Sequence, residues 1–134
     1  MPPNTLGQPI GFPVPGWTAR PRPPLTPMTG RTCRSEPLDP ARHGADLWRA
    51  VSLDRTGANW TYLAYGPFAA EADYRAWLEA MAGKDDPQFH AILDAKTGRA
   101  VGVASYLRID PPVGVIEVGH IHYSPALQRT PPPA

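Results

Sequence analysis

Proline is the feature that most limits how this chain of 134 residues can fold. The sequence contains 19 prolines, and nine of them fall within residues 1–30. Each ring fixes φ and removes a backbone donor, so the stretch 20–27 can only be extended or polyproline-like. We therefore divide the chain into a proline-rich arm, residues 1–30, and one modest domain, residues 31–134.

The arm allows two interpretations. Prolines in the stretch 21–27 twice have the P-x-x-P spacing that proline-binding domains recognise, but this spacing arises easily in any proline-rich tract. In the alternative interpretation the arm lies over the domain surface and is anchored there by its apolar side chains. The anchors expected in that case are Phe12, Val14 and Trp17.

Charge and cysteine content exclude several classes of function. The formal net charge is only +1, which offers little attraction to nucleic acid or to an anionic membrane. Cys33 is the single cysteine, so no intrachain disulfide and no multi-cysteine metal site can form. The sequence has no run of 18 apolar residues and no signal-peptide pattern at its start. We therefore expect a cytoplasmic protein with neither nucleic acid nor membrane as a partner.

Two helices are predicted in the first half of the domain. Asp39 followed by Pro40 is typical of an N-cap and first helical position, and apolar residues follow from Leu47 to Val51 at helical spacing. A second helix is indicated by Tyr74, Trp77, Leu78 and Met81 at i, i+3, i+4 and i+7, with Gly83 as its stop. The aromatic stretch 59–68 between them is too irregular for a helix or a strand. A first strand of weak quality precedes the helices at 30–38.

From Gln88 onward the apolar period changes from helical to alternating. This predicts a strand at 88–93, a turn at 94–98, a strand at 101–109 and a strand at 113–123, which together form an antiparallel meander. Strict alternation in the last strand would place Val115, Glu117, Gly119, Ile121 and Tyr123 on one face and Gly114, Ile116, Val118, His120 and His122 on the other. One strand, two helices and three consecutive strands define an α+β fold.

This order of elements, together with several short motifs, resembles the front part of the GNAT acetyltransferases. The branch with the greatest similarity is that of the ribosomal-protein N-terminal acetyltransferases. The motifs spread over residues 31–130 and include Gly30-Arg31 through Glu36-Pro37-Leu38, Pro67-Phe68 with Trp77-Leu78, Phe89-His90-Ala91-Ile92, Thr97-Gly98, Val101-Gly102-Val103-Ala104-Ser105, Val115 to Ile121, and Ser124-Pro125.

The resemblance implies transfer of an acetyl group from acetyl-CoA to a primary amine, either a protein N-terminus or a small molecule. In that family the pantetheine arm hydrogen-bonds to the backbone of the strand that corresponds to 113–123. The matching groups here are those of Ile121, His122 and Tyr123. A loop of the form [Q/R]-x-x-G-x-[G/A] then holds the pyrophosphate at a helix start. Its place is taken here by Gln128, Arg129 and Thr130, followed by three prolines.

The loop departs from the family pattern in a way that affects binding. Pro131 stands where glycine is usual, Pro133 stands where glycine or alanine is usual, and prolines supply no N–H donors. The sequence is therefore interpreted as a GNAT domain cut inside its pyrophosphate loop. Such a chain is expected to bind acetyl-CoA more weakly than about 1 mM, near 4 kcal/mol of binding, and to be inactive as written.

Glu117 is the candidate general base, because some members of the superfamily carry a catalytic glutamate on this strand. Its apolar neighbours Val115, Val118 and Ile121 could raise its pKa. The alternative is a structural glutamate bonded to a nearby loop. His120 and His122 share the i, i+2 spacing of metal ligands, but no third ligand recurs nearby, so no metal is expected. Cys33 has no activating motif around it and is interpreted as a core or surface residue.

The rival function is a non-catalytic interaction module in which the arm recruits a partner and the meander is only a scaffold. A further expectation holds for either function. The strand at 113–123 should form an edge of the sheet, and its alternating apolar residues would then favour self-association.

Overall fold

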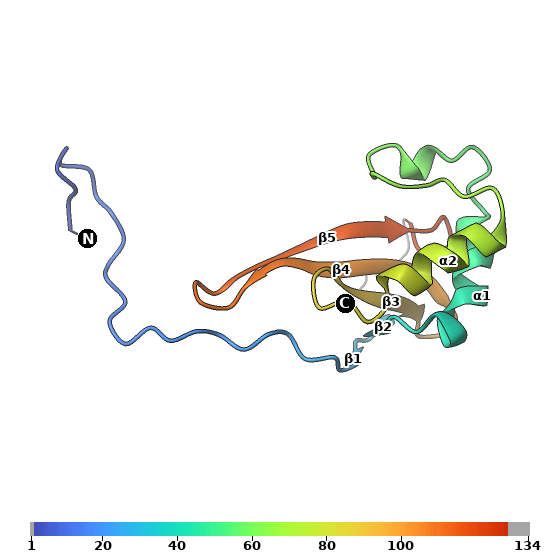
Figure 1. The fold of residues 1–134 in the computed structure, drawn as a ribbon, viewed down its shortest axis with the longest axis horizontal. Coiled ribbons are helices and arrows are strands. Elements are labelled where there is room, and N and C mark those ends of the chain that lie inside the picture. The colour runs from blue at the N-terminus through green and yellow to red at the C-terminus, as the bar shows by residue number, and fades with distance from the viewer. Residues whose placement is uncertain (1, 129–134) are drawn as a thin grey trace.

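Two helices pack against one face of a five-stranded antiparallel sheet in the computed structural model, which describes residues 2–128 (Figure 1). The strands follow one another in sequence order across the sheet. They are β1 (Met28–Thr29), β2 (Cys33–Pro37), β3 (Gln88–Asp94), β4 (Ala100–Asp110) and β5 (Val115–Tyr123); the helices are α1 (Pro40–Val51) and α2 (Glu71–Met81), with a short 3-10 turn, η1, at Ala58–Trp60. The α+β order predicted from the sequence is confirmed, and β1 is an addition to it.

Helix α1 begins as the Asp39-Pro40 pair predicts. The Asp39 side chain accepts a hydrogen bond from the Ala41 N–H at 3.1 Å, and proline occupies the first helical turn, where no intrahelical donor is needed. Helix α2 ends at Met81, two residues before Gly83, which has a φ of 77°. The start of α1 and the end of α2 therefore follow local sequence signals.

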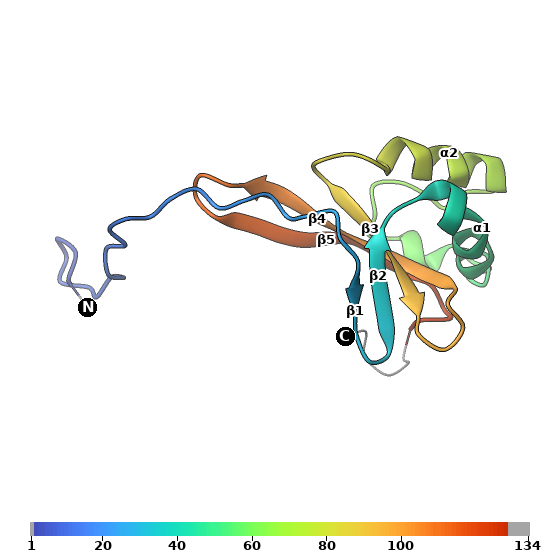
Figure 2. The ribbon, with the colours of Figure 1, turned by 90° about the horizontal axis from the view of Figure 1, so that it is seen from below.

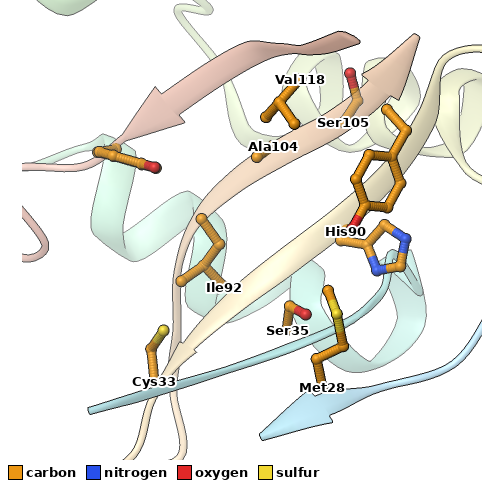
Figure 3. Close-up of a pocket in the computed structure, with 10 residues that line it drawn as sticks. Met28, Cys33, Ser35, His90, Ile92, Ala104, Ser105 and Val118 are labelled. Carbon is orange, nitrogen blue, oxygen red and sulfur yellow. The ribbon is translucent and has the colours of Figure 1, made fainter. Parts of the chain in front are cut away.

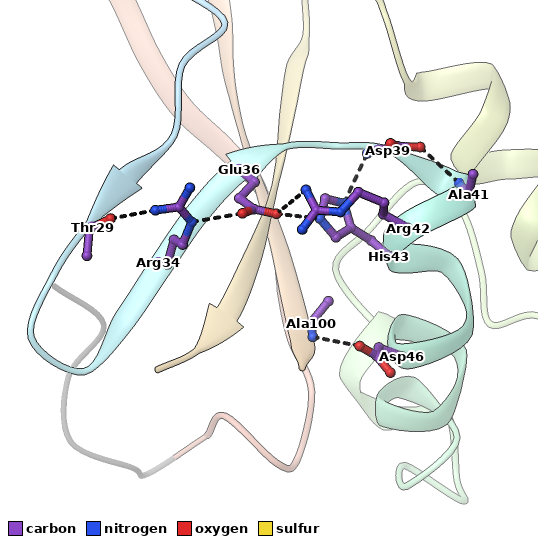
Figure 4. A network of polar contacts seen from close by, with 9 residues as sticks. All are labelled: Thr29, Arg34, Glu36, Asp39, Ala41, Arg42, His43, Asp46 and Ala100. Atoms are coloured by element: carbon purple, nitrogen blue, oxygen red, sulfur yellow. Dashed lines mark hydrogen bonds and ion pairs between the residues drawn. The ribbon is translucent and has the colours of Figure 1, made fainter. Parts of the chain in front are cut away.

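A buried carboxylate joins the start of α1 to the sheet (Figure 4). Glu36 on β2 accepts from Arg34 at 2.8 Å, from Arg42 at 2.9 Å and from His43 Nε2 at 2.9 Å. The Asp39 N–H donates to His43 Nδ1 at 3.0 Å, so the hydrogen of this imidazole lies on Nε2 and points at Glu36. The hydrogen bond from Arg34, followed by that from His43, lowers the pKa of Glu36 from 4.5 to about 2.

The main core lies between the helices and the sheet. Leu47 of α1 and Leu78 of α2 are fully buried, and Tyr74 is almost so. Alternate residues of β3 face them: Phe89, Ala91 and Leu93. A second, smaller cluster lies on the opposite face of the sheet and contains Cys33, Ile92, Val101 and Leu127. The helices thus cover one face of the sheet, while the other carries a thin apolar layer.

A β-bulge changes the face on which the residues of β5 lie, so the predicted strict alternation is wrong. Ser105 pairs with Gly119 and Val103 pairs with His122, which leaves two residues of β5 opposite Ala104 alone. His120, within the bulge, has a φ of 49°. As a result Val118 lines a cavity together with Tyr123, away from the helices, instead of sharing a face with His120 and His122.

The outer part of the β4–β5 hairpin extends beyond the body of the domain (Figure 2). Residues 115–118 of β5 are all exposed, and β5 is the last strand of the sheet. The prediction of a sheet edge at this strand is therefore confirmed for the part of the chain that the structure describes.

The arm contacts the domain through only part of its length. The Trp17 ring donates from Nε1 to the Pro112 carbonyl at 2.8 Å, in agreement with its predicted role as an anchor. Phe12 and Val14 were expected to be anchors too, but they are 68% and 69% exposed. The reason is that the arm continues past the hairpin tip instead of folding back over the sheet (Figures 1 and 2).

Candidate functional site

Three predicted site residues end β5 and a fourth, Gln128, follows the strand; Asn59, a loop residue that the sequence analysis overlooked, bonds to three of these four. The Asn59 amide donates to His122 Nε2 at 3.0 Å and to the Tyr123 carbonyl at 2.8 Å. The Gln128 side-chain amide donates to Asn59 Oδ1 at 2.8 Å and to the Tyr123 backbone carbonyl at 2.7 Å. The structure therefore brings His122, Tyr123 and Gln128 together around Asn59, with Ile121 as the exposed residue before them.

The loop that carries Asn59 is itself held by a carboxylate. Asp54 accepts from the Asn59 N–H at 3.0 Å and from the Gly57 N–H at 3.2 Å. These bonds, the one from Asn59 foremost, lower the pKa of Asp54. A charged cap on this loop fixes the position of the Asn59 side chain against β5.

His122 is a buried, neutral histidine. It is only 3% exposed and lies against the Trp60 ring with 3.9 Å between ring centroids. Burial lowers its pKa from 6.5, and the hydrogen bond from Asn59 requires Nε2 to be an unprotonated acceptor. Its side chain therefore supports the end of β5 and stays uncharged near neutral pH.

His120, in the bulge, faces a different set of groups. Its Nδ1 lies 3.1 Å from the Tyr65 hydroxyl, and the two rings are stacked at 5.8 Å. The Phe89 ring also packs against the imidazole, with 5.6 Å between ring centroids. Burial raises the pKa of Tyr65 to about 12, so this phenol stays protonated and can donate to His120. Both side chains are partly exposed.

Glu117 lies apart from this group. It is five residues before His122 on β5, which corresponds to roughly 15 Å along a strand. Its carboxylate contacts Arg108 Nε at 3.3 Å, and its side chain is 47% exposed. The predicted apolar surroundings are not found, because Val115 and Val118 are themselves more than half exposed and Ile121 is 43% exposed. A catalytic role for Glu117 stays a prediction.

Two further predicted residues, Arg129 and Thr130, lie outside the described residues, as do the three prolines that follow them. Gln128 is the last residue of the predicted pyrophosphate loop that the structure describes.

A cavity of about 200 Å³ lies on the sheet face opposite the helices (Figure 3). It is mainly apolar and is lined by residues from all five strands, among them Met28, Ser35, His90, Ile92, Val118 and Tyr123. Burial lowers the pKa of His90, whose Nε2 contacts the Gln88 side chain at 2.7 Å. Among the residues that the structure describes, no charged side chain lines the cavity.

The histidines and the cysteine show no metal-binding arrangement. Within residues 2–128, no three side chains of His, Cys, Asp or Glu gather in a way that could hold an ion. Cys33 is buried in the smaller apolar cluster, as a core residue would be. Over the same residues, neither helix has the length and apolar character needed to cross a lipid bilayer.

Comparison with known proteins finds solved structures that are similar to this chain. The sequence matches no protein-family model and no curated protein. A GCN5-related N-acetyltransferase from Brucella melitensis is 37% identical over 87% of this chain, with a TM-score of 0.83. A probable acetyltransferase of the GNAT family from Chromobacterium violaceum is 32% identical over 97% of this chain, with a TM-score of 0.79.

The two alignments take in 52% of the Brucella protein and 63% of the Chromobacterium protein. This chain therefore spans between half and two thirds of the length of these structures. Its GNAT-like α+β fold, which the sequence predicted, is confirmed.

Proposed function

We propose that this chain is part of a GNAT N-acetyltransferase that transfers the acetyl group of acetyl-CoA to a primary amine. The observation that carries the proposal is the similarity to the Brucella GCN5-related N-acetyltransferase, at 37% identity and a TM-score of 0.83. The acceptor, a protein N-terminus or a small molecule, belongs to the proposal, as do the ribosomal-protein branch and a cytoplasmic location.

In this proposal the inner end of β5 receives the pantetheine arm. Backbone groups of Ile121, His122 and Tyr123 would pair with it as a neighbouring strand would. The Asn59 amide supports the idea, because it fixes the His122 side chain at the end of the strand. The Tyr123 carbonyl already accepts from both Asn59 and Gln128, so the pairing proposed for Tyr123 would use its N–H. A preorganised strand end lowers the entropic cost of binding an extended ligand.

Two residues on β5 compete for the role of proton acceptor. Glu117 is the predicted base, but it is exposed and paired with Arg108. His120 lies closer to Ile121 and His122 along the strand and contacts the Tyr65 hydroxyl. In an active form of the protein, the pH dependence of turnover separates them: replacing the true base with glutamine removes the rise in rate with pH, whereas the other substitution leaves the profile unchanged.

The pyrophosphate is expected to contribute little to binding by this chain, because Pro131, Pro132 and Pro133 lack N–H donors. This makes a test with ligand fragments informative. Acetyl-CoA, acetyl-pantetheine and adenosine diphosphate would each be titrated at millimolar concentration into 15N-labelled protein. We expect acetyl-CoA and acetyl-pantetheine to shift the amide signals of Ile121 and Tyr123 with affinities within about tenfold of each other, that is, within about 1.4 kcal/mol.

Adenosine diphosphate serves as the control and should leave those signals unchanged. Two results would contradict the proposal. One is the absence of any shift at the end of β5 with either acetylated ligand. The other is a set of shifts confined to the cavity on the opposite face, around Ile92 and Val118. The rival function, an interaction module recruited through the arm, predicts the first of these results.

A further inference from the structure

We infer that residues 2–16, here called the arm tip, pack along the outer β4–β5 hairpin of a second copy of this chain. The inference concerns assembly and does not depend on acetyl transfer. It also identifies which surfaces would meet in the self-association expected from the exposed sheet edge. Three features carry it: the composition of the arm tip, the direction in which it leaves its own domain, and the surface that the hairpin offers.

The arm tip is apolar and exposed. Residues 2–16 contain no charged side chain, and four apolar side chains among them are exposed: Leu6 at 80%, Ile10 at 45%, Phe12 at 68% and Val14 at 69%. Tails that remain solvated are normally rich in charge and poor in such residues. Burial of these side chains would contribute roughly 25 cal/mol per Å² of apolar surface removed from water.

The arm tip also has local structure of its own. The Asn4 side-chain oxygen accepts from the Leu6 and Gln8 N–H groups at 2.9 and 3.0 Å, and the Ile10 N–H bonds to the Pro2 carbonyl. Together these bonds form a small turn at the end of the arm. A preformed turn loses less entropy on docking than a flexible tail would.

Contacts of Trp17 and Arg20 with the hairpin turn, here called the clasp, set the direction of the arm tip. The Trp17 ring bonds to Pro112 and lies over Gly114, where an added Cβ would come within 2.6 Å of the ring. The Arg20 guanidinium lies over the indole at 4.4 Å from the ring centroid, and the Arg20 N–H bonds to the Pro111 carbonyl. Residues before this clasp run on past the hairpin tip, away from their own sheet, in both views (Figures 1 and 2).

The direction of the arm tip is compatible with a two-fold symmetric dimer of this chain. If the axis passes close to Trp17, the arm tip of one copy runs alongside the outer hairpin of the other, and the reverse contact forms at the same time. The outer hairpin offers matching chemistry. Residues 111–118 carry a single charge, at Glu117, and their exposed apolar side chains are Val113, Val115, Ile116 and Val118.

The size of the contact is also sufficient. Each copy would contribute the fifteen residues of its arm tip and the eight residues 111–118 of its hairpin. That total lies within the roughly 20–30 residues a side found in stable interfaces. The alignment with the Chromobacterium structure extends over 97% of this chain, so it runs through most of the arm, which indicates that the arm is a shared feature.

The first test is the oligomeric state of the full chain by sedimentation equilibrium. We expect a dimer, and we expect Phe12→Asp with Val14→Asp to raise its dissociation constant at least about 100-fold, roughly tenfold for each arm tip. The control is Tyr62→Asp, which places the same charge on an exposed aromatic residue outside the arm and the hairpin and should leave the dimer intact. Equal unfolding midpoints of the monomeric forms would show that the domain itself is unaffected.

The second test identifies the surfaces. Phe12 is replaced by the photoreactive p-benzoylphenylalanine, labelled and unlabelled protein are mixed, and the crosslinked peptides are analysed by mass spectrometry. Crosslinks between heavy and light chains at residues 111–121 are expected. Crosslinks confined to one chain would mean that the arm folds back on its own hairpin. A monomeric protein without crosslinks would mean that the arm does not bind a second copy. Each of these two results would overturn the inference.

Discussion

The two ends of the β4–β5 ladder belong to the same two strands, yet they differ in burial. At the inner end, Val103 and His122 are buried beneath the helices and the 54–68 loop. At the outer end, Val115 and Val118 are about half exposed. The difference shows that a strand-forming sequence alone does not bury its side chains, and that a covering element decides whether they contribute to stability.

The largest expected effect lies at the inner end. Trp60 is 5% exposed and packs against Phe68, Tyr74 and His122, so Trp60→Ala should lower the free energy of unfolding by about 3–5 kcal/mol. The matched change at the outer end, Val118→Ala, should alter it by no more than about 0.5 kcal/mol. Urea unfolding in dilute solution, where the chain is monomeric, measures both.

Similar costs for the two substitutions would contradict the comparison. If Val118→Ala proves costly only at high protein concentration, the outer end is covered by association, as the arm-tip inference requires.

The next effect concerns the buried carboxylate beneath α1. Glu36→Gln removes the charge that Arg34, Arg42 and His43 all contact and should cost about 1.5–3 kcal/mol, because hydrogen bonds to charged groups are stronger than neutral ones. The cost should stay below that of a fully buried pair, since both arginines are partly exposed. Urea unfolding at neutral pH tests this value.

The same substitution has a defined pH dependence. The pKa of Glu36 falls from 4.5 to about 2 in the folded chain, so its stabilising contribution is complete above pH 4.5 and disappears as the pH falls towards 2. The difference between wild type and Glu36→Gln should therefore shrink across that interval. A difference that stays constant from pH 6 to about pH 2 would show that the substitution acts through packing instead of charge.

A smaller effect is expected at Asn59, the residue that joins the loop to β5. Asn59→Ala removes the donor to His122 and one of two donors to the Tyr123 carbonyl, at a cost of about 1–2 kcal/mol. Asn4→Ala is a matched control, since Asn4 bonds only within the arm among the described residues. Equal costs for the two variants would mean that the network at the end of β5 contributes nothing.

His122 adds a pH dependence to the same network. Because burial lowers its pKa from 6.5, the unfolded chain takes up a proton before the folded chain does, and stability falls as the pH drops below 6.5. NMR titration of the imidazole should give a midpoint below 6.5. A midpoint above this value would contradict the neutral, accepting role assigned to Nε2.

Most of the fold followed from local signals. Asp39-Pro40 fixed the start of α1, the spacing from Tyr74 to Met81 gave α2, and alternation gave the three strands of the meander. The face assignment in β5 failed because the bulge depends on how Ala104 pairs across the ladder, which the sequence of β5 alone does not encode. The short strand β1 depends on pairing with β2 and has no signal of its own in two residues.

The candidate site was less predictable because its contacts are distant in sequence. Asn59 and Gln128 lie 69 residues apart, and Tyr65 and His120 lie 55 residues apart. The aromatic stretch 59–68 was visible in the sequence, but nothing local indicated that it covers the inner end of β5. The Glu36 network was missed for the same reason, since it needs β2 and α1 to be placed together.

The smallest expected effect lies at the outer end, in the ion pair between Glu117 and Arg108. Both side chains are exposed, at 47% and 78%, and pairs of this kind are worth about 0–1 kcal/mol. Glu117→Gln should therefore change the free energy of unfolding by less than about 0.5 kcal/mol in dilute solution. A double-mutant cycle with Arg108→Gln should give a coupling energy of similar size that decreases with added salt.

A coupling energy that instead grows with protein concentration would mean that the pair loses water on association. The outer hairpin would then be buried in the dimer, as the inner end is buried within one chain. A large coupling at every concentration would mean that the outer end is covered within a single chain, and the contrast between the two ends of the ladder would then fail.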